Sequence, residues 1–253
     1  MYRKRQAVAL SYVDELALPR TARVLEIGCG AGFMAIALAK KGFAVEAVDH
    51  VHAMIELTQR HARQTGVDSL VHAAIEDVHE LTYEDQSFDL LVALGVVTWL
   101  HDLRKALVEI TRVLTPGGYA VLSIDNRYRI HTLIDPLLSL AFESIRKRVG
   151  RELERVLLER TGLRQQRNDL SHLYSIKEFN QYLREANLTS IKNTSIGFGP
   201  FRILGLSIFS DQIGVKVQQK LQQYADSGCP ILRSIGSQYI VLIRKKPSQI
   251  AYE

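Results

Sequence analysis

The sequence predicts an α/β fold built on a mainly parallel sheet, because short apolar runs alternate with helical patterns along the first 125 residues. The chain has 253 residues, which suits one large domain and is enough to bury a substantial core. Hydrophobic residues make up 47% of the chain and charged residues 23%. These fractions are close to the average of globular proteins, so they exclude disordered, collagen-like and fibrous classes.

Each element of the first half has its own sequence pattern. The expected strands are Arg23 to Ile27, Phe43 to Val48, Ser69 to Ala74, Ser87 to Leu94 and Tyr119 to Ile124. The expected helices are Phe33 to Lys41, Val51 to Gln64 and about Leu103 to Leu114. The fourth strand is nearly continuous in apolar residues, as a parallel strand buried on both faces should be. A Thr-Pro-Gly-Gly turn is expected before the fifth strand.

The regular alternation of strands and helices stops after Asn126. Residues from about 130 to 167 have a wholly helical pattern. The elements expected after them are a helix at Ser175 to Glu185, a strand near Thr189 to Ile196, a helical segment at about Ile208 to Ala225 and a final strand at Gln238 to Arg244. We therefore divide the chain into a core at 1–126, a helical cap insertion at 127–171, and a return to the core at 172–253 with a second helical insertion near 205–232.

A glycine-rich turn joins the first strand to the first of these helices. It reads Glu26-Ile-Gly28-Cys-Gly30-Ala-Gly32. Glycine lets the backbone turn tightly and lets a ligand approach without meeting a Cβ, and a helix N-terminus offers N–H groups to an anion. The spacing differs from the G-x-G-x-x-G of dinucleotide-binding turns, and the Lys-Ser or Lys-Thr of a phosphate loop does not follow.

This E-x-G-x-G-x-G turn resembles motif I of the class I S-adenosylmethionine-dependent methyltransferases. Further motifs of that family follow in order and at the family's spacing. They are the run from Asp49 to Met54 after the second strand, the run from Asp77 to Asp89, which ends in Phe-Asp, and the run from Arg112 to Gly118 before the fifth strand. The resemblance covers residues 20–125 well and 172–246 loosely. It is greatest to the small-molecule branch that includes quinone and natural-product methyltransferases.

The resemblance implies a Rossmann-like, doubly wound sheet of seven strands, with the last strand antiparallel, and S-adenosylmethionine as cofactor. In the family, Asp49 would bind both ribose hydroxyls and Met54 would pack on the adenine. Asp77 would accept the adenine amino group, Val78 would offer its main-chain N–H, and Leu94 would lie against the methionine end. The expected cofactor-binding residues are Glu26, Gly28, Gly30, Gly32, Asp49, His50, Met54, Asp77, Val78 and Leu94.

Methyl transfer is an in-line displacement on the sulfonium methyl group, so positioning can supply much of the catalysis and no covalent nucleophile is needed. A general base would help a phenol, hydroxyl or amine acceptor. Such a base should lie beyond the carboxyl ends of the strands or in the insertion. The candidates are His101, His131, His172 and Tyr174. For each histidine, helix capping or solvent exposure is the alternative, and the eight histidines show no metal-ligand spacing, so no metal is expected.

The acceptor class has several alternatives. A small molecule methylated at oxygen or nitrogen is favoured. The chain lacks the Asn/Asp-Pro-Pro-Tyr signature after the fourth strand and an aromatic and basic stripe, which argues against a nucleic-acid acceptor. The alternatives are a macromolecular acceptor, RNA or protein, and a catalytically silent cofactor-binding subunit that activates a partner. A homodimer is also open.

The net charge of +5 is concentrated in one segment of the predicted cap insertion. Residues 143–167 hold eight basic and four acidic side chains. Apolar residues at helical spacing give this segment one face that can pack on the core. An anionic small molecule, or an acidic carrier protein bearing the acceptor, would be attracted by such a segment. A solvated face with Glu–Arg pairs is the alternative interpretation.

The sequence also predicts a cytoplasmic protein without a membrane span. The first residues lack the apolar stretch and the cleavage site of a signal peptide, and the most apolar stretches are too short to cross a bilayer. The two cysteines, Cys29 and Cys229, cannot form a disulfide framework, and both are expected to be structural.

Overall fold

A computed structural model describes residues 2–130, 133, 172–199, 201–203 and 206–247. These residues belong to two compact units. The first comprises 1–125, 172–194 and 239–253, and the second comprises 126–171 and 195–238. Most of the predicted cap insertion, including His131 and the basic segment 143–167, lies outside the described residues.

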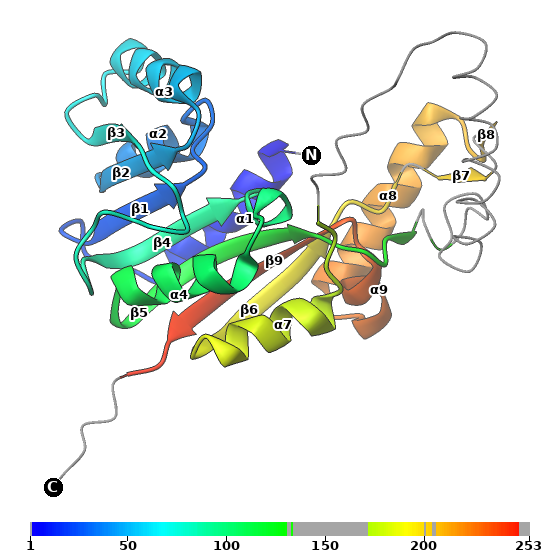
Figure 1. Ribbon diagram of the computed structural model, residues 1–253. Coiled ribbons are helices and arrows are strands. Elements are labelled where there is room, and N and C mark those ends of the chain that lie inside the picture. Colours follow the sequence, from blue (N-terminus) through cyan, green and yellow to red (C-terminus); the bar gives the residue numbers. More distant parts are fainter. Residues whose placement is uncertain (1, 131–132, 134–171, 200, 204–205, 248–253) are drawn as a thin grey trace, which may run out of the picture. The chain divides into compact units, whose positions relative to one another are not determined.

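A seven-stranded mixed sheet forms the centre of the first unit, in the order β3-β2-β1-β4-β5-β9-β6 (Figure 1). Its strands are β1 (Arg23–Ile27), β2 (Ala44–Asp49), β3 (Val71–Ile75), β4 (Phe88–Leu94), β5 (Leu114–Asp125), β6 (Leu188–Ile196) and β9 (Gln238–Lys245). The last strand, β9, runs antiparallel to its neighbours. The sheet therefore confirms the predicted Rossmann-like fold.

The order of the strands indicates where a binding crevice is expected. β1 pairs in parallel with β2 on one side and with β4 on the other, so that Leu25 lies opposite both Glu46 and Leu91. The chain moves outward from β1 to β2 and β3 and then returns to the other side of β1 with β4. In open α/β sheets, ligands bind at such a switch point, beyond the carboxyl ends of the strands.

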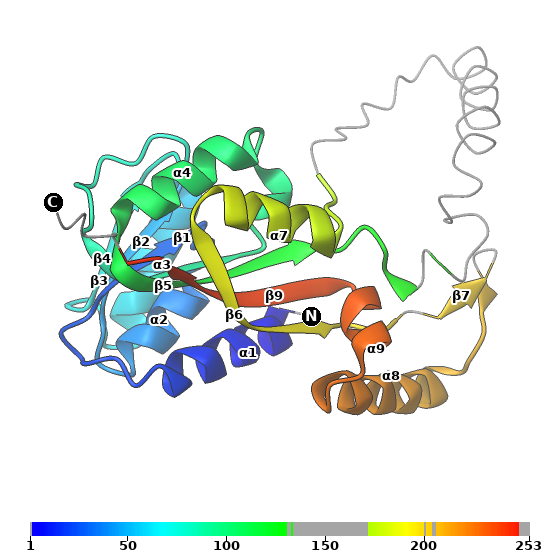
Figure 2. The ribbon, with the colours of Figure 1, turned by 90° about the horizontal axis from the view of Figure 1, so that it is seen from below.

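Helices cover both faces of the sheet (Figure 2). On one face lie α1 (Tyr2–Glu15) and α2 (Phe33–Ala39), and on the other lie α4 (Leu103–Val113) and α7 (Ile176–Glu185). α3 (His52–Gln64) packs on β2 and β3. Side chains fix two helix starts: Asp102 accepts from the Lys105 N–H at 3.0 Å, and Ser175 forms a capping box with Glu178.

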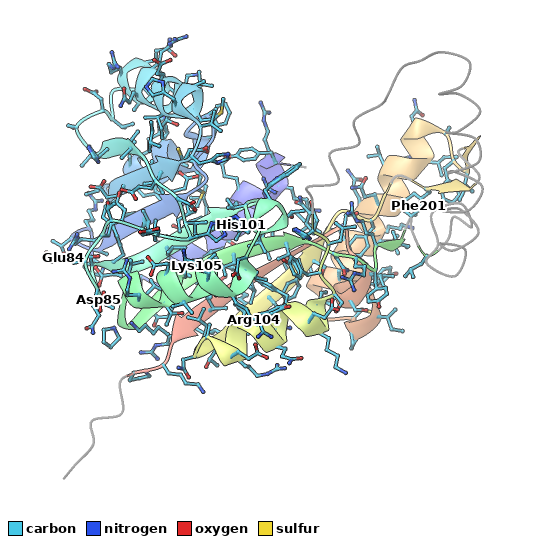
Figure 3. All side chains as sticks on the ribbon, viewed as in Figure 1. Glu84, Asp85, His101, Arg104, Lys105 and Phe201 are labelled. Atoms are coloured by element: carbon cyan, nitrogen blue, oxygen red, sulfur yellow. The ribbon has the colours of Figure 1, made fainter. Side chains whose placement is uncertain are left out.

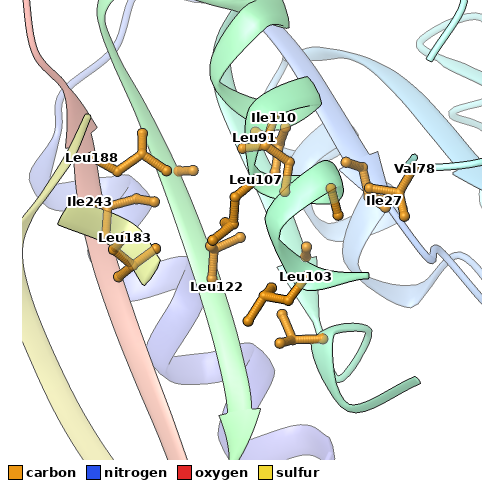
Figure 4. Packing of buried hydrophobic residues seen from close by; sticks show 14 of the residues in the cluster. Ile27, Val78, Leu91, Leu103, Leu107, Ile110, Leu122, Leu183, Leu188 and Ile243 are labelled. Carbon is orange, nitrogen blue, oxygen red and sulfur yellow. The ribbon is translucent and has the colours of Figure 1, made fainter. Parts of the chain in front are cut away.

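The hydrophobic core of the first unit includes a layer between the sheet and the α4–α7 face (Figure 4). Five apolar side chains of α4 recur at helical spacing and are buried, which turns one face of that helix onto the sheet: Leu103, Ala106, Leu107, Ile110 and Val113. Leu107 and Ile110 pack there with Leu91 and Leu122, and Leu183 of α7 extends the same layer. Burial of these residues stabilises the sheet and so holds in place the edge at which the candidate site lies.

β5 differs from its predicted start. The strand begins at Leu114, five residues before the expected Tyr119, and it contains the predicted Thr-Pro-Gly-Gly turn. Leu114 pairs with Phe88 and Tyr119 pairs with Leu90, so the pairing register shifts across the glycines. Gly117 has a φ of 79°, a backbone conformation that favours glycine. The predicted turn is thus an irregularity within one strand.

The second unit holds short elements that the sequence pattern did not show. They are the antiparallel pair β7 (Arg202–Ile203) and β8 (Leu206–Ser207), and the helix α9 (Pro230–Ile235). α8 (Asp211–Asp226) matches the predicted helical segment within a few residues. The buried Asn126 amide donates to the carbonyls of Ser234 and Gly236, at 2.8 and 3.0 Å. No helix of the described residues is long and apolar enough to cross a membrane.

Candidate functional site

The glycine-rich turn lies at the carboxyl end of β1, and its three glycines have positive φ angles of 67°, 53° and 76°. A Cβ added at Gly28 would lie 2.3 Å from the Val96 side chain, and one at Gly32 would lie 2.7 Å from the Thr58 side chain. A Cβ at Gly30 would meet no described atom within 4 Å. Close packing therefore requires two of the glycines, whereas Gly30 faces open space.

Asp49 ends β2 next to this turn and is buried. Its Oδ2 accepts from the Gly30 N–H at 2.9 Å, and its Oδ1 accepts from the Val51 N–H at 3.0 Å. The exposed His50 ring lies 3.6 Å from Oδ1. Each carboxylate oxygen can accept a further hydrogen bond. Asp49 thus holds the turn and retains the capacity to bind a pair of hydroxyls.

Glu26 lies in β1, before the first glycine, and only 4% of it is exposed. Burial raises the pKa of its carboxyl group to about 8, opposed by the Ala35 N–H and reinforced by the charge of Asp49. Its Oε2 has no hydrogen-bond partner among the described residues. A buried carboxyl oxygen without a partner is costly, and a cationic ligand group would compensate that cost.

The raised pKa of Glu26 predicts that stability depends on pH. Folding favours the protonated form, so this contribution is fully present below about pH 4.5 and is lost as the pH rises through about 8. Glu26→Gln is isosteric and cannot ionise, so the variant should gain stability relative to the parent between pH 6 and pH 9, by on the order of a few kcal/mol. Urea unfolding at several pH values measures this. Parallel stability curves for the two proteins would contradict it.

A cavity of about 310 Å³ opens at the carboxyl ends of β1, β2, β3 and β4. Five of the predicted cofactor residues line it: Gly28, Asp49, His50, Asp77 and Val78. The lining residues that were not predicted as cofactor-binding are Ile27, Val48, Glu76, His79, Gly95, Val96, Trp99, Leu100 and His101. The remaining predicted residues lie outside the lining: Glu26 on β1, Gly30 and Gly32 in the glycine-rich turn, Met54 on α3 and Leu94 on β4.

A carboxylate and two histidines lie together on one wall of this cavity. The Asp77 Oδ1 accepts from the His79 main-chain N–H at 2.9 Å and lies 2.6 Å from the His79 Nδ1. These contacts with His79, its main-chain N–H first, lower the pKa of Asp77. The rings of His79 and His101 pack together with centroids 3.7 Å apart. Both histidines line the cavity.

The structure separates the predicted base candidates. His101 is exposed, lines the cavity and lies between β4 and α4, close to Arg104 and Lys105 of that helix (Figure 3). His172 and Tyr174 do not line the cavity. The His172 main-chain N–H donates to the Thr98 carbonyl at 2.7 Å, and the partly buried Tyr174 packs edge-on against Tyr182 beside the core.

The N-terminal helix contributes to the same edge of the sheet. The half-buried Arg5 of α1 packs against Gly95 so closely that a Cβ there would lie 2.4 Å from its Nη1. Burial lowers the pKa of Arg5, and the charge of Asp125 opposes that shift. Burial and the charge of Glu26 raise the pKa of Tyr2 to about 12. α1 therefore closes over the end of β4.

Comparison with known proteins agrees with this geometry. Residues 25–122 match the profile of a family described as a methyltransferase domain. Residues 25–122 therefore form a methyltransferase domain, and the predicted resemblance to the class I S-adenosylmethionine-dependent methyltransferases is confirmed over this part of the chain. S-adenosylmethionine is the cofactor that such a domain implies.

Individual relatives and one solved structure show which proteins the chain is similar to. The chain is 28% identical over 120 residues to a ubiquinone biosynthesis O-methyltransferase of Coxiella burnetii, covering 47% of this chain and 50% of that protein. It is 30% identical over 119 residues to the protein of that name from Paracidovorax citrulli, with the same coverage. The chain thus matches these curated relatives over about half their length. A SAM-dependent methyltransferase structure from Methanosarcina mazei superposes with a TM-score of 0.58 at 18% identity, covering 93% of this chain and 97% of that one.

Proposed function

We propose that this chain transfers the methyl group of S-adenosylmethionine to a small molecule, at an oxygen or a nitrogen atom. The observation that carries the proposal is the buried Asp49 at the end of β2, whose two oxygens are fixed by the glycine turn and the start of α3. A carboxylate held in this way beside a cavity suits a ribose diol, because each oxygen can accept one hydroxyl.

The residues of the site fit the chemical parts of the cofactor. The unpartnered Glu26 Oε2 suits the ammonium group of the methionine end, since a cation would satisfy a buried acceptor. The open space at Gly30 leaves room beside the main chain. The Asp77 carboxylate is 61% exposed at the cavity and suits the amino group of the adenine base.

The cofactor supplies a sulfonium methyl group, and the protein supplies position. Asp49 and the glycine turn would fix the ribose, while Asp77 and Val78 would fix the base. The methionine end would then lie between Glu26 and the end of β4. An acceptor that enters at this end can be held in line with the methyl group, and alignment of this kind removes much of the barrier. Whether His101 acts as a general base stays a prediction.

The names of the relatives support oxygen as the methylated atom and a small molecule as the acceptor, since both are ubiquinone biosynthesis O-methyltransferases. A phenol or hydroxyl on a planar, apolar ring is the acceptor chemistry that we propose. Trp99 is 65% exposed at the cavity and offers a flat apolar surface for such a ring. An anionic or carrier-bound acceptor, and a homodimer, stay predictions.

Two measurements test the proposal. Calorimetry should show one S-adenosylmethionine site per chain, and incubation with methyl-labelled cofactor should label small phenolic acceptors. Absence of cofactor binding would contradict the proposed function. Labelling of RNA or protein in place of small molecules would favour the macromolecular alternative. Binding without transfer to any acceptor, restored by a partner protein, would favour the silent subunit.

A further inference from the structure

Among the residues that the structure describes, His79 alone makes hydrogen bonds to the Asp77 carboxylate. The main-chain N–H of His79 and its ring Nδ1 both contact the Asp77 Oδ1, at 2.9 and 2.6 Å. An ionised carboxylate only accepts hydrogen bonds, and the lowered pKa of Asp77 favours that ionised form. The ring proton of His79 therefore lies on Nδ1. Neither contact uses the Oδ2 of Asp77.

Burial fixes the ring that makes this contact. The His79 side chain is 6% exposed, whereas the Asp77 side chain is 61% exposed. One face of the His79 ring packs on His101, with the two planes inclined by 34°. Its Nε2 is buried and has no hydrogen-bond partner among the described residues. A buried nitrogen without a partner lowers stability, so an apolar ring would suit this position better if packing alone mattered. The contact with Asp77 is the interaction that explains why the ring is a histidine.

We infer that His79 is a positioning residue for recognition of the cofactor's base: it fixes the Asp77 carboxylate so that Oδ2 accepts the amino group of adenine. This inference rests on the proposed binding of S-adenosylmethionine. It concerns selectivity among bases. A fixed carboxylate accepts from an exocyclic amino group and repels a carbonyl oxygen in the same place, so the site should reject hypoxanthine.

The test compares two ligands that differ only at the base. Calorimetry with S-adenosylhomocysteine and S-inosylhomocysteine gives the adenine preference as a ratio of dissociation constants. We expect His79→Phe, which keeps a flat ring but loses the Nδ1 donor, to lower the preference on the order of tenfold. A merely structural role would weaken both ligands alike and leave the ratio unchanged.

Two further variants separate the donor from the volume of the side chain. An asparagine amide can place an N–H near the position of Nδ1, whereas a glutamine amide reaches the position of Nε2. We expect His79→Asn to restore the preference and His79→Gln to leave it lowered. If His79→Phe fails to fold, this pair decides the test. His101→Ala removes the packed ring without touching Asp77, and it should weaken both ligands equally.

The outcomes distinguish the inference from the proposed function. If Asp77→Asn lowers the adenine preference but the His79 variants keep it, the inference is wrong and the proposed function stands. If neither ligand binds the parent protein, or if Asp77→Asn keeps the preference, the proposed binding at Asp77 is wrong. If Asp77→Asn and His79→Phe lower the adenine preference and His79→Asn restores it, the result supports both the inference and the proposed function.

Discussion

Asp49→Ala is expected to weaken the binding of S-adenosylhomocysteine by about 100-fold or more. The carboxylate is the proposed acceptor for both ribose hydroxyls, and each charge-assisted hydrogen bond contributes on the order of 1.5–3 kcal/mol. The substitution also removes the acceptor of the Gly30 and Val51 N–H groups, so the glycine turn and the start of α3 each lose one fixed contact. Calorimetry of the parent and the variant measures the change.

A second acid on the same strand provides the control for this experiment. Glu46 also lies in β2, but its carboxylate contacts His72, 2.6 Å away, and it does not line the cavity. Glu46→Gln should therefore leave the affinity unchanged within about twofold. Asp49→Asn should fall between the parent and Asp49→Ala, because its single carbonyl oxygen can still accept. An Asp49→Ala protein that binds as the parent does would overturn the assignment of the ribose site.

Gly30→Val should abolish cofactor binding while the fold persists. The Cβ of a residue at this position meets no described atom within 4 Å, so the added Cβ does not collide with the protein. It would occupy the space that the proposed ligand needs beside the main chain. The φ of 53° is unfavourable for an L-residue and costs about 1–2 kcal/mol. Binding by calorimetry and unfolding by urea should be measured on the same preparation.

Gly66 supplies a matched control for that backbone cost. It follows α3, has a φ of 68°, and a Cβ there would also meet no described atom within 4 Å. Gly66 does not line the cavity. Gly66→Val should lose similar stability yet bind the cofactor normally. Equal losses of binding in both variants would show that Gly30→Val acts through the backbone, and the proposed ligand position would be wrong.

The parts of the fold that could be predicted are those set by local pattern. β1 has its predicted bounds, and the other strands of the first half begin and end within two residues of prediction, except for the start of β5. A strand buried on both faces requires a continuous apolar run, which the sequence displays directly. α9 has six residues and no buried side chain, so it leaves no periodic signal.

The candidate site also has a part that the sequence predicts and a part that it does not. The glycine turn, Asp49 and Asp77 follow a sequence motif, and the structure gathers them at one sheet edge. The packing of His79 on His101 joins residues 22 positions apart, and the approach of Arg5 to Gly95 joins residues still farther apart. Such contacts arise from tertiary packing, and no local spacing encodes them. Three of the four base candidates lie in the described residues, and only the lining of the cavity distinguishes His101 from His172 and Tyr174.

The hydrogen bonds of Asp49 link folding to ligand recognition. The Gly30 and Val51 N–H groups already bind this carboxylate in the protein alone. The entropic cost of fixing the carboxylate is therefore incurred when the chain folds and not when the ligand binds. The same bonds mean that stability and affinity cannot be adjusted separately at this position. A lineage or a design that changes the sugar contact must therefore rebuild the turn as well.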